Sequence, residues 1–326
     1  MKDITWRGLP PAVRGKVWKL AIPNDLRITE ELFKIFLGHA NNAKMAFNKE
    51  HTQKNGKTLG NLELFQSPVT TPTNKPVINL RNANNNIKTG SGGIRTSEDD
   101  ITGDVLDLET TSMGLILQDI QDTFPQLMIF QKGGPLHNDL IDVLGAYICY
   151  RPDIGYVPGM TFLGAMFLLN MEKADAFQCL SNHINSVCYL SFFRQDPSGI
   201  PKYLNAMDAT VEALLPNLDR HFKEIGISSK NYLVDWITTL FSKALPLDIA
   251  TRIWDLVFIE GEIFIYRTSL AILRYFIADL QHATYDESID LFTRLPQRKV
   301  SEDKLFDEIS SIVLDQKKFD QLLQKK

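Results

Sequence analysis

The chain has 326 residues, of which 44% are hydrophobic and 23% are charged, a composition that is ordinary for a soluble globular protein of one large or two medium domains. Its 35 Lys and Arg residues against 39 Asp and Glu residues give a net charge of −4, which argues against nucleic acid as a partner. The sequence has no apolar run of about 18 residues and no secretory leader after Met1, so we expect no transmembrane helix. Any membrane contact is then expected to come through a partner or through a part of the protein outside this sequence.

The cysteine and histidine residues predict neither a metal site nor a nucleophile. Cys149, Cys179 and Cys188 form no CxxC pair and lie in apolar helical surroundings, so we expect reduced thiols in the core of a cytosolic protein. The six histidines are scattered, without an HxxxH, HExxH or Cys/His cluster. We therefore expect no metal and no cofactor.

The chain opens on a predicted helix that follows a Gly-Leu-Pro-Pro turn at residues 8–11. Its apolar residues recur at helical spacing, at Val13, Val17, Trp18 and Leu20. This spacing predicts that Trp18 is a core anchor. Arg14, four residues earlier, has two open roles, a surface charge or a brace for a later carboxylate. Thr29 is a predicted N-cap for the next helix, over residues 30–47.

A long segment of different composition follows, from about residue 48 to residue 106. It is rich in Asn, Thr, Ser, Gly, Lys and Pro and includes the runs NANNN and TGSGG, so we interpret it as a mobile insertion and not as a domain. The Gly-Lys-Thr triplet at 56–58 resembles the end of a phosphate-binding loop. The glycine that this motif needs earlier is His51, and no strand precedes it, so we interpret the match as chance.

The next predicted helix, over residues 113–124, presents one acidic residue away from its apolar side. The apolar residues that share one stripe of the helical wheel are Met113, Ile116, Leu117, Ile120 and Phe124. Asp122 lies about 180° from Met113 on the same wheel. Pro125 ends the segment, because a proline cannot continue a helix interior. We therefore predict that Asp122 points outward near the end of a short helix.

A loop rich in Gly and Pro, over residues 151–159, precedes another apolar helix. Loops of this kind, placed at a helix start on a packed scaffold, often present binding groups. We predict that this loop and the Asp122 end of the earlier helix form the two halves of one binding face.

Runs of helical periodicity continue to the end of the chain, and strand-like alternation is nearly absent. Only the turn at 131–135 and the loop at 261–265 suggest short extended pieces. The sequence therefore predicts an all-α, multi-helix fold in a single domain over residues 1–326. We expect an N-terminal lobe over residues 1–200, which includes the insertion, and a C-terminal helical lobe over residues 201–326.

Four motifs in order resemble those of the TBC domain, the module of Rab GTPase-activating proteins. RGLPPAVRGKVW resembles the opening motif of the family, with Arg14 and Trp18 at its RxxxW positions. ILQDIQDTFP, over residues 116–125, resembles the second motif, IxxDxxRTFP, and GYVPGM, over residues 155–160, resembles the third, YxQGM. The family's C-terminal pattern of Trp, FxxxxP and Trp-Asp follows over residues 232–258. The resemblance implies a two-lobed, all-α TBC domain.

Two positions depart from the family pattern. In the family, the arginine of the second motif and the glutamine of the third enter the nucleotide site of the Rab, where they neutralise phosphoryl charge and position the attacking water. Here these catalytic positions are Asp122 and Pro158. An arginine finger supplies about 10³ to 10⁵ in rate, whereas an aspartate about 4 Å from phosphate charge repels it by roughly 4 kcal/mol at an effective dielectric near 20. Pro158 lacks both a side-chain amide and a backbone N–H.

Other motif positions are retained. The resemblance implies that Asp119 and Tyr156 shape the site, and that Gly159 and Met160 hold the loop against the scaffold. The residues that we predict to bind the partner are Asp119, Thr123, Tyr156, Gly159, Met160 and Arg151. The alternative is that the retained motif residues now serve the fold alone.

The resemblance therefore implies a cytoplasmic regulator in vesicle trafficking that binds a Rab-family small GTPase with little or no GTPase activation. Such a protein reaches endosomal or other vesicle membranes only indirectly, through its partner. The alternative is an active GTPase-activating protein in which Arg151, Gln121 or Lys132 replaces the missing groups. Of these, Gln121 lies about 100° from Asp122 on the helix.

Overall fold

The computed structural model describes residues 6–58, 111–293, 295 and 299–324. Every regular element within these ranges is a helix, which confirms the all-α prediction. The α-helices are, in chain order, α2 (Pro11–Ala21), α3 (Glu30–Thr58), α5 (His137–Tyr150), α6 (Met160–Leu168), α7 (Lys173–Asn185), α8 (Val187–Phe193), α9 (Ile200–Leu214), α10 (Pro216–Ile225), α11 (Leu233–Thr238), α12 (Leu247–Glu260), α13 (Ile263–Tyr275), α14 (Ile277–Leu280), α15 (Tyr285–Thr293), α16 (Glu302–Ser311) and α17 (Gln316–Gln324). Residues 111–119 are also α-helical. The short 3-10 helices are η3 (Ile120–Asp122), η4 (Pro125–Leu127) and η5 (Ser229–Asn231).

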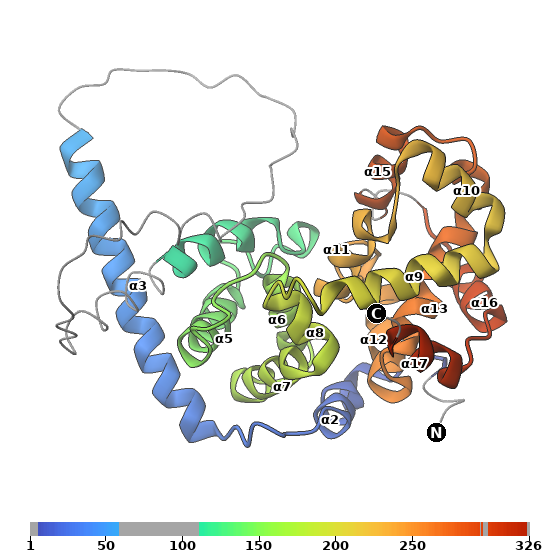
Figure 1. The fold of residues 1–326 in the computed structure, drawn as a ribbon. Coiled ribbons are helices and arrows are strands. Elements are labelled where there is room, and N and C mark those ends of the chain that lie inside the picture. Colours follow the sequence, from blue (N-terminus) through green and yellow to red (C-terminus); the bar gives the residue numbers. More distant parts are fainter. Residues whose placement is uncertain (1–5, 59–110, 294, 296–298, 325–326) are drawn as a thin grey trace, which may run out of the picture.

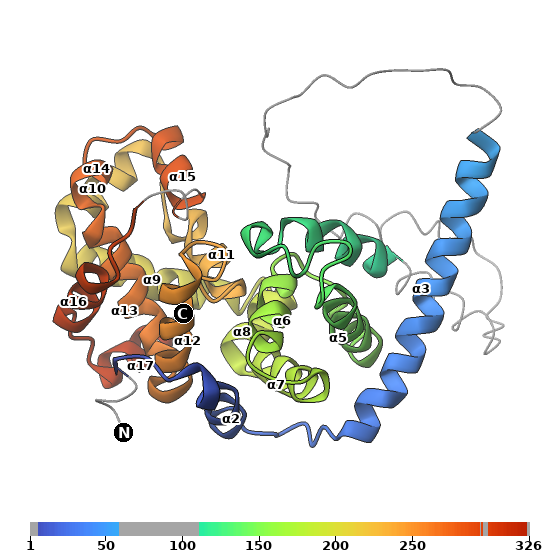
Figure 2. The ribbon, with the colours of Figure 1, turned by 180° about the vertical axis from the view of Figure 1, so that it is seen from behind.

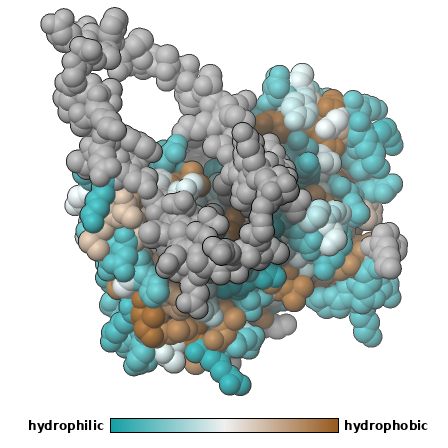
Figure 3. All heavy atoms as spheres, turned by 60° about the vertical axis from the view of Figure 1, so that its left-hand side comes forward, coloured by the Kyte–Doolittle hydropathy of each residue, from teal (hydrophilic) through white to brown (hydrophobic). Residues whose placement is uncertain are grey.

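The helices lie in two groups, which Figure 1 shows side by side and Figure 2 shows from behind. In one group α5 packs against α3, α6 and α7, and in the other α9 packs against α10 and α17, and α13 against α12 and α16. Helix α2 contacts α7 of the first group and α12 of the second, so it bridges the two. On the face that Figure 3 brings forward, hydrophobic residues gather in patches between hydrophilic ones. The lobe boundary near residue 200 stays a prediction.

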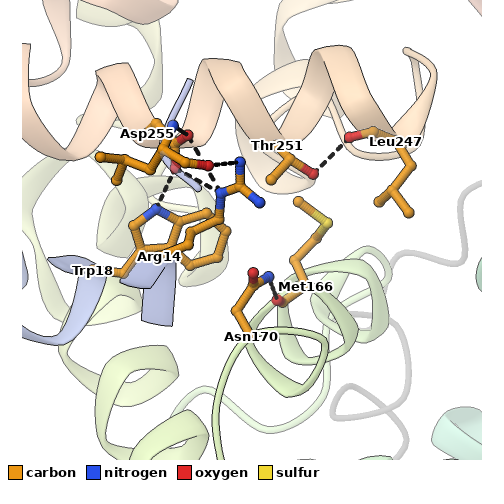
Figure 4. Close-up of polar contacts among 8 residues, drawn as sticks. Arg14, Trp18, Met166, Asn170, Leu247, Thr251 and Asp255 are labelled. Carbon is orange, nitrogen blue, oxygen red and sulfur yellow. Dashed lines mark hydrogen bonds and ion pairs between the residues drawn. The ribbon is translucent and has the colours of Figure 1, made fainter. Parts of the chain in front are cut away.

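The buried carboxylate of Asp255 on α12 joins α2 to the rest of the fold (Figure 4). It accepts a hydrogen bond from the Leu9 backbone N–H at 2.8 Å, from Arg14 Nε at 3.1 Å and from Trp18 Nε1 at 2.7 Å. Burial raises the pKa of Asp255, and the hydrogen bonds from Leu9, Arg14 and Trp18 oppose this rise. Of the two roles that the sequence leaves open for Arg14, the structure shows the brace for a later carboxylate.

The Trp18 indole is fully buried, as predicted for a core anchor. Its ring centroid lies 5.2 Å from that of Trp254 and 6.1 Å from that of Phe167, so residues of α2, α6 and α12 meet around it. The predicted N-cap of α3 is also observed, because Thr29 Oγ1 accepts a hydrogen bond from the Leu32 N–H at 3.2 Å.

Two sequence expectations differ from the structure. Helix α3 continues to Thr58, so residues 48–58 are helical and the triplet at 56–58 lies in its last turn; the remainder of the predicted insertion lies outside the described residues. The extended pieces expected at 131–135 and 261–265 are both wrong, because residues 131–135 form turns and bends and α13 begins at Ile263. The run from Ile263 to Tyr266 is buried all round, and such a run shows no helical stripe that would distinguish it from a buried strand.

We expect Arg14→Ala to lower the free energy of unfolding by about 3–5 kcal/mol, because it leaves a buried carboxylate without its guanidinium partner. Lys19→Ala is the control: the Lys19–Asp175 pair has side chains that are 41% and 39% exposed, and such pairs contribute about 0–1 kcal/mol. Urea unfolding followed by circular dichroism measures both. Equal losses in the two variants would contradict a structural role for the buried pair.

We expect the neutral, buried His183 to make the protein less stable in acid. Burial lowers the pKa of His183 from 6.5 to about 3, so below pH 6.5 the unfolded chain takes up a proton that the folded chain does not. This contribution is absent above pH 6.5 and destabilises the fold by about 1.4 kcal/mol per pH unit as the pH falls towards 3. His183→Phe should flatten the measured dependence of unfolding free energy on pH over this range. The same slope in His183→Phe as in the wild type would refute the assignment, and exposed His282→Gln is the control.

Candidate functional site

The helical segment 111–119 and η3 end in a projecting tip at Asp122. Met113, Ile116 and Ile120 are fully buried and Phe124 is 3% exposed, whereas Asp122 is exposed. This burial agrees with the helical wheel, on which Asp122 lies opposite the apolar stripe. The tip therefore carries a carboxylate at its surface and is held by apolar packing underneath.

The helix ends at the tip through local hydrogen bonds and a left-handed turn. Thr123 is fully buried, and its hydroxyl donates to the Asp119 carbonyl at 2.9 Å. Phe124 has φ +43°, an uncommon conformation for a residue with a side chain, and η4 follows directly. The Phe124 ring meets Phe162 of α6 edge-on at 5.2 Å, which anchors the turn.

A hydrogen bond joins the two motif segments: the Tyr156 hydroxyl donates to Asp119 Oδ2 at 2.7 Å. Tyr156 is 1% exposed, and burial, followed by the Asp119 carboxylate, raises its pKa well above the usual value. The phenol thus keeps its proton and remains a donor. The loop and the helix end, which we predicted to be halves of one face, are linked at this bond.

The loop at residues 155–160 rests closely on the end of α11. Gly159 has φ +102°, and a Cβ atom there would lie 3.1 Å from Thr239 Cγ2. Met160 is fully buried, and its Sδ accepts a hydrogen bond from the Val157 N–H at 3.4 Å. Pro158 is exposed, so it stands at the surface while its neighbours hold the loop.

The wall behind this loop is itself bent in an uncommon way. Leu240 and Phe241 follow Thr239 with φ +44° and +60°, and both side chains are fully buried. The Trp254 indole donates to the Leu240 carbonyl at 2.9 Å. Because Trp254 also packs on Trp18, the wall under Gly159 is tied to the same cluster that holds α2.

Arg151 is engaged within the protein. Its guanidinium donates to both oxygens of Asp153, at 2.8 and 2.9 Å, and to Asn185 Oδ1 at 3.2 Å. Arg194 reaches the same Asp153 at 2.7 Å. The hydrogen bonds from Arg151 and then from Arg194 hold the pKa of Asp153 far below its usual value. Of the three proposed substitutes, Arg151 is therefore half-buried and paired, whereas Gln121 and Lys132 are exposed.

Sequence reasoning missed one residue at the tip, Gln131, and saw only a turn at 131–135. The Gln131 side-chain amide donates to the Thr123 carbonyl at 3.0 Å and to the Gln121 carbonyl at 3.4 Å. The turn itself is tight, because a Cβ on Gly134 would lie 2.4 Å from the Ile129 carbonyl oxygen. The Gly-Gly-Pro sequence signals the turn, but nothing in the pattern indicates which way the glutamine points.

In the part of the chain that the structure describes, no group of three or more His, Cys, Asp and Glu side chains is placed to hold a metal ion. Within the same residues, no helix is both long and apolar enough to cross a membrane. Cys149, Cys179 and Cys188 are buried, and none of the three forms a disulfide bond.

The chain belongs to the Rab-GTPase-TBC domain family, whose family model matches residues 94–281. It is 72% identical to Drainin of Dictyostelium discoideum over 327 residues, a match that covers 100% of this chain and 72% of that protein. It is 40% identical to TBC1 domain family member 12 of Xenopus tropicalis, covering 96% of this chain and 39% of the relative. For TBC1 domain family member 14 of Homo sapiens the identity is also 40%, over 99% of this chain and 40% of the relative. The chain thus spans less than half the length of these last two proteins.

Two solved structures share the fold. The TBC domain of a Chlamydomonas flagellar RabGAP aligns with a TM-score of 0.63 at 18% identity, covering 95% of this chain and 83% of that one. The Ypt/Rab-GAP domain of Gyp1p aligns with a TM-score of 0.61 at 16% identity, covering 95% of this chain and 89% of that one. The resemblance drawn from the motifs is confirmed at the level of family and fold.

We expect Gly159→Ala to destabilise the protein by about 1–2 kcal/mol, because an L-residue is strained at φ +102° and the added methyl meets the wall at Thr239. Gly38→Ala is the matched control. Gly38 lies within α3 with no atom within 4 Å of an added Cβ, so this change should stabilise by about 0.5–1 kcal/mol. Thermal unfolding of both variants decides the matter, and a neutral Gly159→Ala would contradict the close packing of the loop.

Proposed function

We propose that this chain binds a Rab-family small GTPase and accelerates GTP hydrolysis little or not at all. Membership of the Rab-GTPase-TBC domain family supports the class of partner. The observation that carries the proposal is the exposed Asp122 at the tip, at the position where the family pattern expects an arginine. A carboxylate there opposes the charge that a phosphoryl-transfer site must neutralise.

The contrast between buried and exposed motif residues supports binding without catalysis. Asp119, Thr123, Tyr156 and Met160 take part in hydrogen bonds within the protein, and Gly159 packs against α11. We therefore assign these five residues the role of shaping and supporting the partner-binding face. The two positions at which the catalytic groups are missing, Asp122 and Pro158, are both exposed.

The other proposed contact, Arg151, has less support. Its guanidinium is already paired with Asp153 and Asn185, so contact with a partner would require it to give up hydrogen bonds. The same pairing weighs against Arg151 as a substitute finger. For the alternative function, an active GTPase-activating protein, exposed Gln121 and Lys132 remain the candidate substitutes.

The proposed setting is vesicle trafficking in the cytoplasm. The protein then reaches endosomal or other vesicle membranes through the GTPase that it binds. Its net charge of −4 supplies no general attraction to anionic lipid, which favours recruitment by a partner over direct adsorption.

We expect the wild type to bind at least one GTP-loaded Rab in a panel and to leave its single-turnover hydrolysis rate within about twofold of the intrinsic rate. Asp122→Arg combined with Pro158→Gln should accelerate hydrolysis by about 10²-fold or more, because it restores a cation and a water-positioning amide. Asp122→Ala is the matched control, since it removes the negative charge without adding a finger and should bind without accelerating.

The same assay separates the alternative. Acceleration of about 10²-fold by the wild type would refute the non-catalytic proposal. Its loss in Lys132→Ala, Gln121→Ala or Arg151→Ala would then identify the substitute. Absence of binding to every Rab tested would overturn the choice of partner.

A further inference from the structure

Four backbone carbonyls at the end of the Asp122 tip accept hydrogen bonds, and two of these bonds come from one side chain. A helix end leaves its last carbonyls without partners inside the helix. Here Asp119 O accepts from the Thr123 hydroxyl and Ile120 O accepts from the Thr123 N–H at 3.2 Å. Gln121 O and Thr123 O both accept from the Gln131 side chain.

These two carbonyls flank Asp122. The Gln131 amide therefore forms hydrogen bonds with the residues immediately before and immediately after Asp122. The Gln121 carbonyl belongs to the peptide unit before Asp122, and the Thr123 N–H, which donates to the Ile120 carbonyl, belongs to the one after it. Together these contacts hold the backbone of the tip on both sides of Asp122.

Gln131 is itself held in a rigid loop. Its carbonyl accepts from the Gly134 N–H at 2.8 Å, and Ile129 O accepts from the Leu136 N–H at 3.0 Å across the base of the loop. His137 Nδ1 lies 2.7 Å from the Phe130 carbonyl, at the start of α5. The loop thus connects the start of α5 to the tip through hydrogen bonds.

The oxygen atom of the Gln131 side-chain amide also bears on why a glutamine lies here. Its Oε1 is buried, and no donor in the described residues reaches it. A buried acceptor without a partner is unfavourable, so a glutamine here is not explained by solvation or by packing alone. The two bonds from its Nε2 are the interactions that hold it in place.

We infer that Gln131 is the positioning residue of the tip and that it sets the affinity for the GTPase by fixing the backbone of residues 120–124. Only the part of this inference that concerns affinity for the GTPase rests on the proposed function. The clamp on the tip is a property of the free protein and is measured without any partner.

The test compares Gln131→Met and Gln131→Glu with the wild type. Methionine keeps the length of the side chain and removes the donors, and glutamate places a carboxylate against two carbonyl oxygens. Gln126→Met, at an exposed position of η4, is the matched control. Hydrogen exchange of the free protein reports on residues 120–124, and the Kd and dissociation rate are measured for a Rab that the wild type binds.

We expect exchange at the tip to rise about tenfold in Gln131→Met and further in Gln131→Glu, with exchange in α5 unchanged. The Kd should weaken about tenfold through faster dissociation, in the same order, since preorganised contacts act mainly on the dissociation rate. Gln126→Met should match the wild type in every readout. If the Gln131 side chain only filled space, Gln131→Met would match the wild type in exchange and in Kd.

Unchanged exchange at 120–124 in both Gln131 variants would overturn the clamp. Raised exchange with an unchanged Kd would overturn its role in recognition. If the wild type binds no Rab, the proposed function falls and the link to recognition falls with it, while the exchange data alone still decide whether Gln131 holds the tip.

Discussion

The buried carboxylate of Asp255 is the constraint on which the arrangement of the helices depends. It accepts hydrogen bonds from Leu9, Arg14 and Trp18 and so holds them against α12. These three residues lie more than two hundred residues earlier in the chain. A charge in such a place is tolerated only when its partners are complete, and the loss of one partner costs about 3–5 kcal/mol. The pair thus fixes where α2 lies more than it adds to stability.

The same cluster reaches the candidate site through one indole. Trp254 packs on Trp18 and donates to the Leu240 carbonyl, at the wall on which Gly159 rests. From there the loop leads to the Tyr156–Asp119 bond and to the tip. The retained motif residues are therefore connected by packing and hydrogen bonds, and the two residues that depart from the motifs are exposed. A change at an exposed position alters chemistry and leaves the support intact.

Periodicity predicted the features that depend on neighbours a few residues apart: the stripe under Asp122, the burial of Trp18 and the Thr29 cap. It did not predict those that depend on distant partners. Arg14 kept two roles because its carboxylate lies on α12, and Gln131 was missed because a turn motif carries no information on side-chain direction. The pairing of Arg151 with Asn185 was hidden for the same reason. The start of α13 was predicted wrongly because a segment that is buried on all sides shows no hydrophobic periodicity.

The consecutive left-handed residues Leu240 and Phe241 make the shape of the wall depend on the packing around it. Each such residue stores on the order of 1–2 kcal/mol of backbone energy that only the surrounding packing offsets. The buried Leu240 and Phe241 side chains and the hydrogen bond from Trp254 to the Leu240 carbonyl supply that packing. The tip also carries a left-handed residue, Phe124 at φ +43°, so both halves of the site depend on side-chain packing to hold an uncommon backbone.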